Sequence, residues 1–153
     1  MQTAILFSSK SDDWATPQDL FDALDAEFQF DIDAAASKEN AKCPVWYGGL
    51  IDALALKQWS TEPSTIWLNC PYSLCRQFIA KAAQEARRGS TVVCLVPSRT
   101  DTRWFHSEVY DAERRQYRPG VEVRFVKGRL KFVGAAAGAP FPSMVVIFRP
   151  PCS

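Results

Sequence analysis

Apolar residues along the chain follow two spacings, one typical of helices and the other of strands. The segment that begins at Thr16 has the residues preferred at a helix start, with Thr16 as cap, Pro17 at the first helical position and Asp19 in the first turn. Apolar residues then recur on one face, which predicts a helix of about three turns. These residues are Leu20, Phe21, Leu24 and Phe28.

Four further apolar runs have the short length and the β-branched or aromatic content of strands. They are residues 28–33, 64–68, 91–96 and 143–148. The run 91–96 is continuous and β-rich, which is typical of a central strand that is buried on both faces. The run 28–33 leads into the small-residue turn 34–37, and the last run ends at Pro150.

Two more helical segments are expected between these strands. Ser73 is a suitable cap for a helix that runs to Arg88 and stops at Gly89. Residues 101–110 are also compatible with a helix. Residues 38–65 carry no long periodic run, so we expect mostly loop with one short helix or strand.

The second half of the chain predicts an antiparallel addition to the sheet. Residues 121–126 and 129–133 flank Lys127-Gly128, which is the pattern of a hairpin. Strands that alternate with helices and then a late hairpin predict a compact, three-layer α/β fold with a mostly parallel central sheet. A length of 153 residues predicts one domain that spans residues 1–153.

The composition is that of an ordinary globular protein, with 47% hydrophobic and 23% charged residues. No apolar run approaches the roughly 20 residues needed to span a bilayer. Met1–Ser9 lacks the basic start and cleavage site of a signal peptide. We therefore expect a cytoplasmic protein with no membrane partner.

The cysteine pattern predicts buried, reduced thiols. The number of cysteines is odd, no pair has Cys-x-x-Cys spacing, and His106 is the single histidine. Neither a disulfide framework nor a metal site is expected from such a set. The cysteines are Cys43, Cys70, Cys75, Cys94 and Cys152.

The net charge of +1 hides an asymmetry along the chain. Residues 1–69 hold 4 basic and 11 acidic side chains, whereas residues 70–153 hold 14 basic and 6 acidic ones. The basic excess is largest in residues 99–131. A polyanion such as a nucleic acid would suit this second half. A solvated surface with salt bridges is the alternative explanation.

The most informative motif is Asn69-Cys70-Pro71-Tyr72, which directly follows a predicted strand. In open α/β sheets, ligands bind at the carboxyl ends of the strands. An amide side chain, a backbone carbonyl and an aromatic face at that edge can accept hydrogen bonds from an exocyclic amino group and stack on its ring. Four residues alone are a weak signal, and a plain strand-to-helix turn is the alternative.

Together with other segments, this motif resembles the small DNA N6-adenine methyltransferases of phages and prophages (Dam-like). The resemblance covers roughly residues 14–149 and is specific because several blocks match in order. These blocks are residues 14–17 with the helix that follows, 30–36, 69–73, 95–105, 122–132 and 140–144. The resemblance implies a Rossmann-like methyltransferase fold that uses S-adenosylmethionine.

In such enzymes the motif holds the target nitrogen, which implies roles for Asn69, Cys70, Pro71 and Tyr72. Asn69 would accept one amino hydrogen, the Cys70 carbonyl would accept the other, and Tyr72 would stack on the base. Cys70 stands where Pro is usual, but the required atom is a backbone carbonyl, so we expect the chemistry to be kept. A catalytic thiol is rejected because no histidine is near in sequence.

The resemblance also implies a cofactor site between residues 14 and 56. The Asp33 carboxylate would bind the ammonium of the methionine part, and the Asp52 carboxylate would accept from the cofactor adenine. The alternatives are a core position for Trp14, a turn cap for Asp33 and an exposed loop acid for Asp52. The candidate residues are Trp14, Thr16, Pro17, Asp33, Ala34, Ala35 and Asp52.

Double-stranded DNA would then meet the basic segments between residues 98 and 131. Arg99 and Arg103 would contact phosphates near the target, and Trp104 would line the base pocket or belong to the core. The candidate residues are Arg99, Thr100, Arg103, Trp104, Lys127, Arg129 and Lys131.

The same motif also serves methyl transfer to cytosine N4, RNA adenine or a protein glutamine amide. The basic half favours a nucleic acid, and the resemblance favours DNA adenine. A non-catalytic DNA-binding module that retains the fold is a further alternative, and the intact Asn69 and Tyr72 argue against it.

Overall fold

The computed structural model describes residues 14–151. Met1–Ser9, for which no signal peptide is expected, and Cys152 lie outside the described residues. The other four cysteines are free and buried, so the prediction of buried, reduced thiols is confirmed for them. No helix in the described part is long and apolar enough to cross a membrane.

A six-stranded sheet forms the centre of the fold, with the strand order β2-β1-β3-β4-β8-β7. Strands β1 to β4 are mutually parallel, whereas β8 is antiparallel to both of its neighbours, β4 and β7. The strands are β1 (Ile32–Asp33), β2 (Val45–Trp46), β3 (Thr65–Leu68), β4 (Thr91–Pro97), β7 (Val121–Phe125) and β8 (Ser143–Phe148). A separate hairpin joins β5 (Tyr110–Asp111) and β6 (Gln116–Tyr117).

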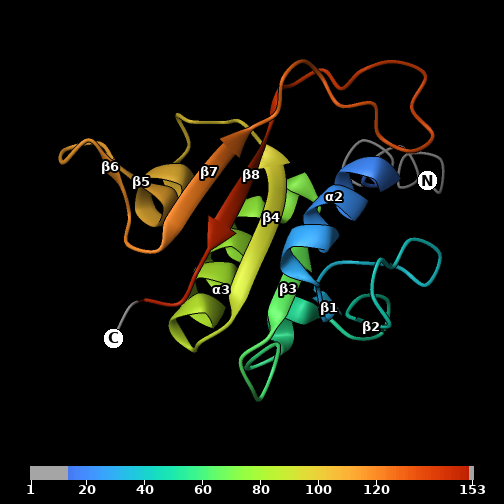
Figure 1. Ribbon diagram of the computed structural model, residues 1–153, viewed down its shortest axis with the longest axis horizontal. Helices are drawn as coiled ribbons and strands as arrows, with labels where there is room; N and C mark the ends of the chain where they lie inside the picture. Colours follow the sequence, from blue (N-terminus) through green and yellow to red (C-terminus); the bar gives the residue numbers. More distant parts are fainter. Residues whose placement is uncertain (1–13, 152–153) are drawn as a thin grey trace, which may run out of the picture.

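Helices cover both faces of this sheet, α2 (Gln18–Phe28) on one and α3 (Cys75–Arg87) on the other (Figure 1). Alternate strand residues therefore enter two hydrophobic clusters. Trp67 packs in the cluster of α2, whereas its neighbours Ile66 and Leu68 pack in the cluster of α3. Both clusters are well buried. The predicted α/β class, the mostly parallel sheet and the three layers are confirmed.

The first helix has the predicted length of about three turns but begins one residue later, and the first strand is shorter than predicted. Helix α2 begins at Gln18, so Pro17 takes the cap position and Thr16 does not cap the helix. The predicted strand 28–33 is reduced to β1, because Phe28 still belongs to α2 and Gln29 ends the helix in the left-handed conformation (φ 58°). The loop expected over 38–65 contains only β2 and the short turn η1 (Ala53–Ala55).

The second helix also begins later than predicted. Residues Tyr72–Leu74 form a 3-10 turn, η2, and α3 follows from Cys75 with Leu74 at its cap position. Its end before Gly89 agrees with the prediction, because that glycine has a φ of 112°. Within the segment 101–110, a helical turn, η3, spans Phe105–Val109.

The predicted hairpin between residues 121–126 and 129–133 is wrong. Strand β7 pairs instead with β8, in a register that places Val121 opposite Phe148. Every residue of β8 is buried, so this strand needs a neighbour on each edge. Phe132 leaves the strand path and packs in the α2 cluster, where it is 2% exposed.

Candidate active site

Asn69 follows the carboxyl end of β3, and contacts with the start of the described chain fix its side chain. Its Nδ2 donates to the Trp14 carbonyl at 2.5 Å and to the Thr16 Oγ1 at 2.9 Å. A carbonyl can only accept, so Nδ2 must face Trp14 and Oδ1 must face away from it. Oδ1 is buried and accepts no hydrogen bond within the described residues. A buried acceptor without a donor costs about 1–3 kcal/mol, so it points to a ligand that donates one.

Aromatic rings surround the other end of the motif. The Tyr72 ring stacks on Trp14, with centroids 6.5 Å apart and an interplanar angle of 16°, and meets Phe141 edge-on at 5.1 Å. Trp14 also contacts Phe132 and Phe141 edge-on. The Trp14 ring therefore belongs to an aromatic cluster, as its core alternative described. The Tyr72 hydroxyl is buried and has no hydrogen-bond partner among residues 14–151.

The environment of Cys70 argues against a catalytic thiol. Its side chain is 1% exposed. A hydrogen bond with the Cys75 thiol and burial together raise the pKa of Cys70 well above its ordinary value. The neutral thiol is a poor nucleophile, so a nucleophilic role for the Cys70 sulfur is not supported.

A cavity of about 500 Å³ adjoins Asn69 and Pro71. This volume lies in the range of roughly 300–1,000 Å³ that is usual for small-molecule sites. The turn 34–37 and the segment 47–53 form two of its sides, and Leu74 and Phe78 contribute a third. Among the predicted cofactor residues, the cavity brings together Ala34, Ala35 and Asp52, whereas Trp14, Thr16 and Pro17 do not line it.

Gly48 allows the two sides of this cavity to approach each other. A Cβ at position 48 would lie 1.7 Å from the backbone oxygen of Ala36, so any other residue would push the segments apart. Sequence reasoning did not select Gly48, Tyr47 or Phe78 for the site. The Gly48-Gly49 pair was the visible signal for a close backbone approach.

The two predicted carboxylates both hold turns around the cavity. Asp33 is 2% exposed and accepts from the backbone amides of Ala35 at 3.3 Å and Lys42 at 3.0 Å. Burial raises the pKa of Asp33 to about 6. The exposed Asp52 accepts from the Leu54 amide at 3.0 Å and begins η1. Asp52 lines the cavity, while Asp33 lies in a small adjoining pocket with Thr16 and Asn69.

A second cavity of about 370 Å³, which we call the basic cleft, opens beside Tyr72. Arg99 and Trp104 line it, as predicted for residues that follow β4. Trp104 is also 7% exposed and packs in the α3 cluster, as its core alternative described, and its role in a base pocket stays a prediction. The remaining lining residues are Ser73, Cys75, Pro97 and Thr102, which sequence reasoning did not select.

The other predicted DNA-binding residues do not line the basic cleft. The Thr100 carbonyl contacts His106 Nε2 at 2.8 Å, and Arg103 is exposed on the same segment. Lys127, Arg129 and Lys131 are exposed in the loop after β7. Arg129 also donates to the Ala139 carbonyl at 3.3 Å.

Some of the arginines in the basic half of the chain form contacts with other residues of the protein. Arg124 makes two hydrogen bonds to the Glu27 carboxylate, at 2.7 and 2.8 Å, and pairs with Glu122. Arg149 pairs with Glu122, and Arg118 donates to the His106 carbonyl. The salt-bridge explanation of the charge asymmetry is therefore correct for Arg124 and Arg149. No group of three His, Cys, Asp or Glu side chains within residues 14–151 could hold a metal ion.

Comparison with known proteins identifies the family. The DNA N-6-adenine-methyltransferase (Dam) family matches residues 3–152. The chain belongs to this family. The prediction from the sequence blocks is thereby confirmed.

Two phage relatives carry the name DNA N-6-adenine-methyltransferase. The protein of Escherichia phage T1 is 34% identical over 93 residues, which are 60% of this chain and 38% of the T1 protein. The protein of Haemophilus phage HP1 is 28% identical over 150 residues, which are 93% of this chain and 81% of the HP1 protein.

Proposed function

We propose that this protein transfers a methyl group from S-adenosylmethionine to N6 of adenine in double-stranded DNA. The observation that carries the proposal is the buried, unpaired Oδ1 of Asn69. This acceptor belongs to a motif that touches both the 500 Å³ cavity and the basic cleft. Membership of the Dam family supports the reaction and the DNA substrate.

In this proposal, the motif positions the amino group and supplies no covalent step. Asn69 Oδ1 accepts one N–H of the adenine amino group, the Cys70 carbonyl accepts the other, and the Tyr72 ring stacks on the base. These two hydrogen bonds turn the nitrogen lone pair toward the cavity and stabilise the positive charge that develops on the nitrogen. Each such interaction is worth on the order of 2–4 kcal/mol in the transition state.

The cavity residues fit the cofactor by size and by chemistry. The turn 34–36 and Gly48 keep the backbone close to a ligand, and Asp52 offers a carboxylate to an exocyclic amino group. Asp33 holds the turn and, when ionised, adds negative charge near an ammonium. When bound there, S-adenosylmethionine would supply an electrophilic methyl group. Thr16 orients Asn69, and Pro17 places Thr16 at the start of α2.

DNA would bind across the basic cleft. Arg99 and Arg103 form no ion pair within the described residues, so their charges are available to phosphates. The target base must leave the duplex to reach Tyr72 and Trp104, which costs a few kcal/mol. Lys127, Arg129 and Lys131 would extend the contact along the backbone. We propose that one domain carries all of these parts.

The test is the chemical identity of the modified base in DNA from cells that express the protein. The DNA is digested to nucleosides and analysed by mass spectrometry, and a second sample is treated with nucleases sensitive to adenine methylation. We expect N6-methyladenine and altered digestion. N4-methylcytosine would move the proposal to the other base, and DNA binding without any modified base would favour the non-catalytic module.

A further inference from the structure

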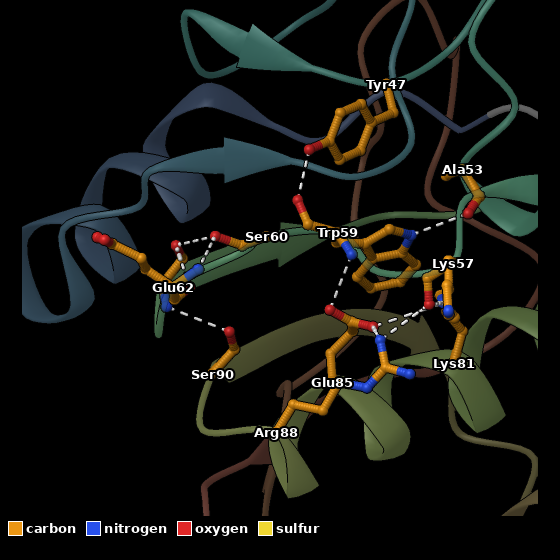
Figure 2. A network of polar contacts seen from close by, with 11 residues as sticks. Tyr47, Ala53, Lys57, Trp59, Ser60, Glu62, Lys81, Glu85, Arg88 and Ser90 are labelled. Atoms are coloured by element: carbon orange, nitrogen blue, oxygen red, sulfur yellow. Dashed lines mark hydrogen bonds and ion pairs between the residues drawn. The ribbon is translucent and has the colours of Figure 1, made fainter.

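A network of polar contacts ties the wall of the 500 Å³ cavity to helix α3 (Figure 2). At its centre is Glu85, whose side chain is 1% exposed. Its Oε1 accepts from the Trp59 backbone amide at 2.8 Å. Its Oε2 lies 3.5 Å from Lys81 Nζ and 3.6 Å from Arg88 Nη1. The same two cations donate to the Lys57 carbonyl, at 2.7 and 2.9 Å.

Trp59 connects Glu85 to residues that line the cavity. Its indole Nε1 donates to the Ala53 carbonyl at 3.0 Å, and its own carbonyl accepts from the Tyr47 hydroxyl at 2.5 Å. Its ring also lies 6.3 Å from the ring of Phe78. Tyr47, Ala53 and Phe78 all line the cavity, whereas Trp59 does not. Figure 2 shows Glu85 reaching Trp59 from α3, and Tyr47 reaching its carbonyl.

The segment that this network holds has little regular structure of its own. Between β2 and β3 the structure contains only the short turn η1. A buried ion pair is weak evidence for stability, because well-packed apolar residues would serve the core as well. Glu85 is a fully buried carboxylate, and one of its oxygens accepts a hydrogen bond from a backbone amide of this loop. The contact is better explained by the position in which it holds the loop.

We propose that Glu85 is a positioning residue that holds the segment 47–59 through Trp59 and thereby sets the affinity of the cavity for its ligand. For S-adenosylmethionine as the ligand, the inference rests on the proposed function. Glu85 does not line the cavity or the basic cleft, so its effect should fall on cofactor binding and not on the chemical step.

The test compares Glu85→Ala with the conservative variant Glu85→Gln. We expect Glu85→Ala to raise the KM and Kd for S-adenosylmethionine on the order of tenfold, because the Trp59 amide and two cations lose their partner. Glu85→Gln should recover most of this loss, since its amide oxygen still accepts from Trp59. The kcat at saturating cofactor and DNA should stay near that of the wild type. Trp59→Phe, which removes the donor to Ala53, should raise KM in the same direction.

A second measurement needs no cofactor. Amides of the segment are hydrogen-bonded within it, such as Ile51 to the Gly48 carbonyl and Ala55 to the Asp52 carbonyl, both at 3.0 Å. Hydrogen exchange at residues 47–56 should be faster in Glu85→Ala than in the wild type, with exchange in β4 unchanged, whereas Glu85→Gln should stay closer to the wild type. Ile147→Val, a core variant on the other face of the sheet, serves as the control for general destabilisation and should leave KM unchanged.

Three results would overturn the inference. These are unchanged exchange at residues 47–56 in Glu85→Ala, an unchanged KM in a Glu85→Ala protein that is clearly destabilised, and a fall in the kcat of Glu85→Ala that equals the fall in its kcat/KM. A wild-type protein that binds no S-adenosylmethionine, while Glu85→Ala still shows faster exchange, would contradict the proposed function and support the positioning role of Glu85.

Discussion

The two cavities beside the Asn69 motif are built in different ways. The 500 Å³ cavity is held by contacts that are complete within the protein: Asp33 to two backbone amides, Gly48 against Ala36, and Glu85 to Trp59. The basic cleft instead carries Arg99, which is exposed and forms no ion pair within residues 14–151. One side is preorganised, and we propose that a polyanion completes the other. We therefore expect variants on the two sides to differ in which ligand they affect.

The motif that begins at Asn69 touches both cavities, and the removal of the Asn69 side chain should have the largest effect. We expect Asn69→Ala to lower the single-turnover rate of methyl transfer on the order of a thousandfold, because the variant has no acceptor for the amino group. Tyr72→Ala should also abolish measurable transfer. The measurement is incorporation of labelled methyl groups into DNA at saturating cofactor and DNA.

Thr16→Val is the matched variant for Asn69→Ala and should have an intermediate effect on the rate of methyl transfer. It keeps the Asn69 side chain but removes one of the two acceptors that orient it, so the rate should fall by roughly tenfold. Thermal unfolding confirms that each variant is folded. A folded Asn69→Ala variant with near-normal activity would contradict the role of the amide.

On the preorganised side, Asp33 should make stability depend on pH. The folded pKa of about 6 lies above the ordinary value of 3.8, so the folded state holds the proton more tightly. The stabilisation is present below pH 4 and is lost as the pH rises to 6, amounting to about 3 kcal/mol. Asp33→Asn should remove this slope. Denaturant unfolding from pH 4 to 7 measures how the free energy of unfolding depends on pH. The same dependence in the wild type and in Asp33→Asn would refute its assignment to Asp33.

Gly48→Ala should act on cofactor binding alone. The new Cβ must displace the Ala36 carbonyl, so the affinity for S-adenosylmethionine should fall by roughly tenfold or more, with DNA affinity unchanged. Gly49→Ala is the control, because its Cβ would meet no atom within 4 Å although its φ is also positive. Calorimetry on both variants measures their affinity for S-adenosylmethionine. Equal losses in both would mean that backbone strain, not the close approach, is responsible.

On the basic side, Arg99→Ala and Arg103→Ala should weaken DNA binding only a few-fold each. The expected signature is a shallower salt dependence, by about 0.9 in the log-log slope for each phosphate that the variant no longer neutralises. Cofactor affinity should not change. Arg87→Ala, at the far end of α3, removes the same charge as a control. If Arg87→Ala reduced the salt dependence of DNA binding by as much, the effect would come from overall charge and not from a contact with a phosphate.

Cys70→Pro should have the smallest effect. The predicted role uses only the carbonyl of residue 70, so the rate should stay within a few-fold of the wild type. Removal of the hydrogen bond with the Cys75 thiol should cost less than about 1.5 kcal/mol of stability. Complete loss of activity in a folded Cys70→Pro protein would count against the carbonyl.

These expectations also show where sequence reasoning succeeds. The strands β3, β4 and β8 are continuous apolar runs, and burial on both faces of a central sheet requires such runs. The Asn69 motif was found because the carboxyl end of a parallel strand is a general ligand site. Fold class and motif were therefore predictable.

The errors come from contacts between distant segments. Thr16 looks like a helix cap, but its hydroxyl accepts from Asn69, 53 residues away. The neighbouring segments 121–126 and 129–133 favoured a local hairpin, but β8 needed a second partner, and β7 supplies it. The Trp59–Glu85 contact has no local signal, because neither residue shows its partner in the surrounding pattern.

The most direct test is a structure of the protein with a non-reactive cofactor analogue and a DNA duplex that contains the target adenine. We predict that N6 of an extrahelical adenine lies within hydrogen-bond distance of Asn69 Oδ1, while Nδ2 keeps its contacts with Trp14 and Thr16. An amide that turns Oδ1 away from the base, or an adenine bound outside the space between Asn69 and Tyr72, would contradict the account.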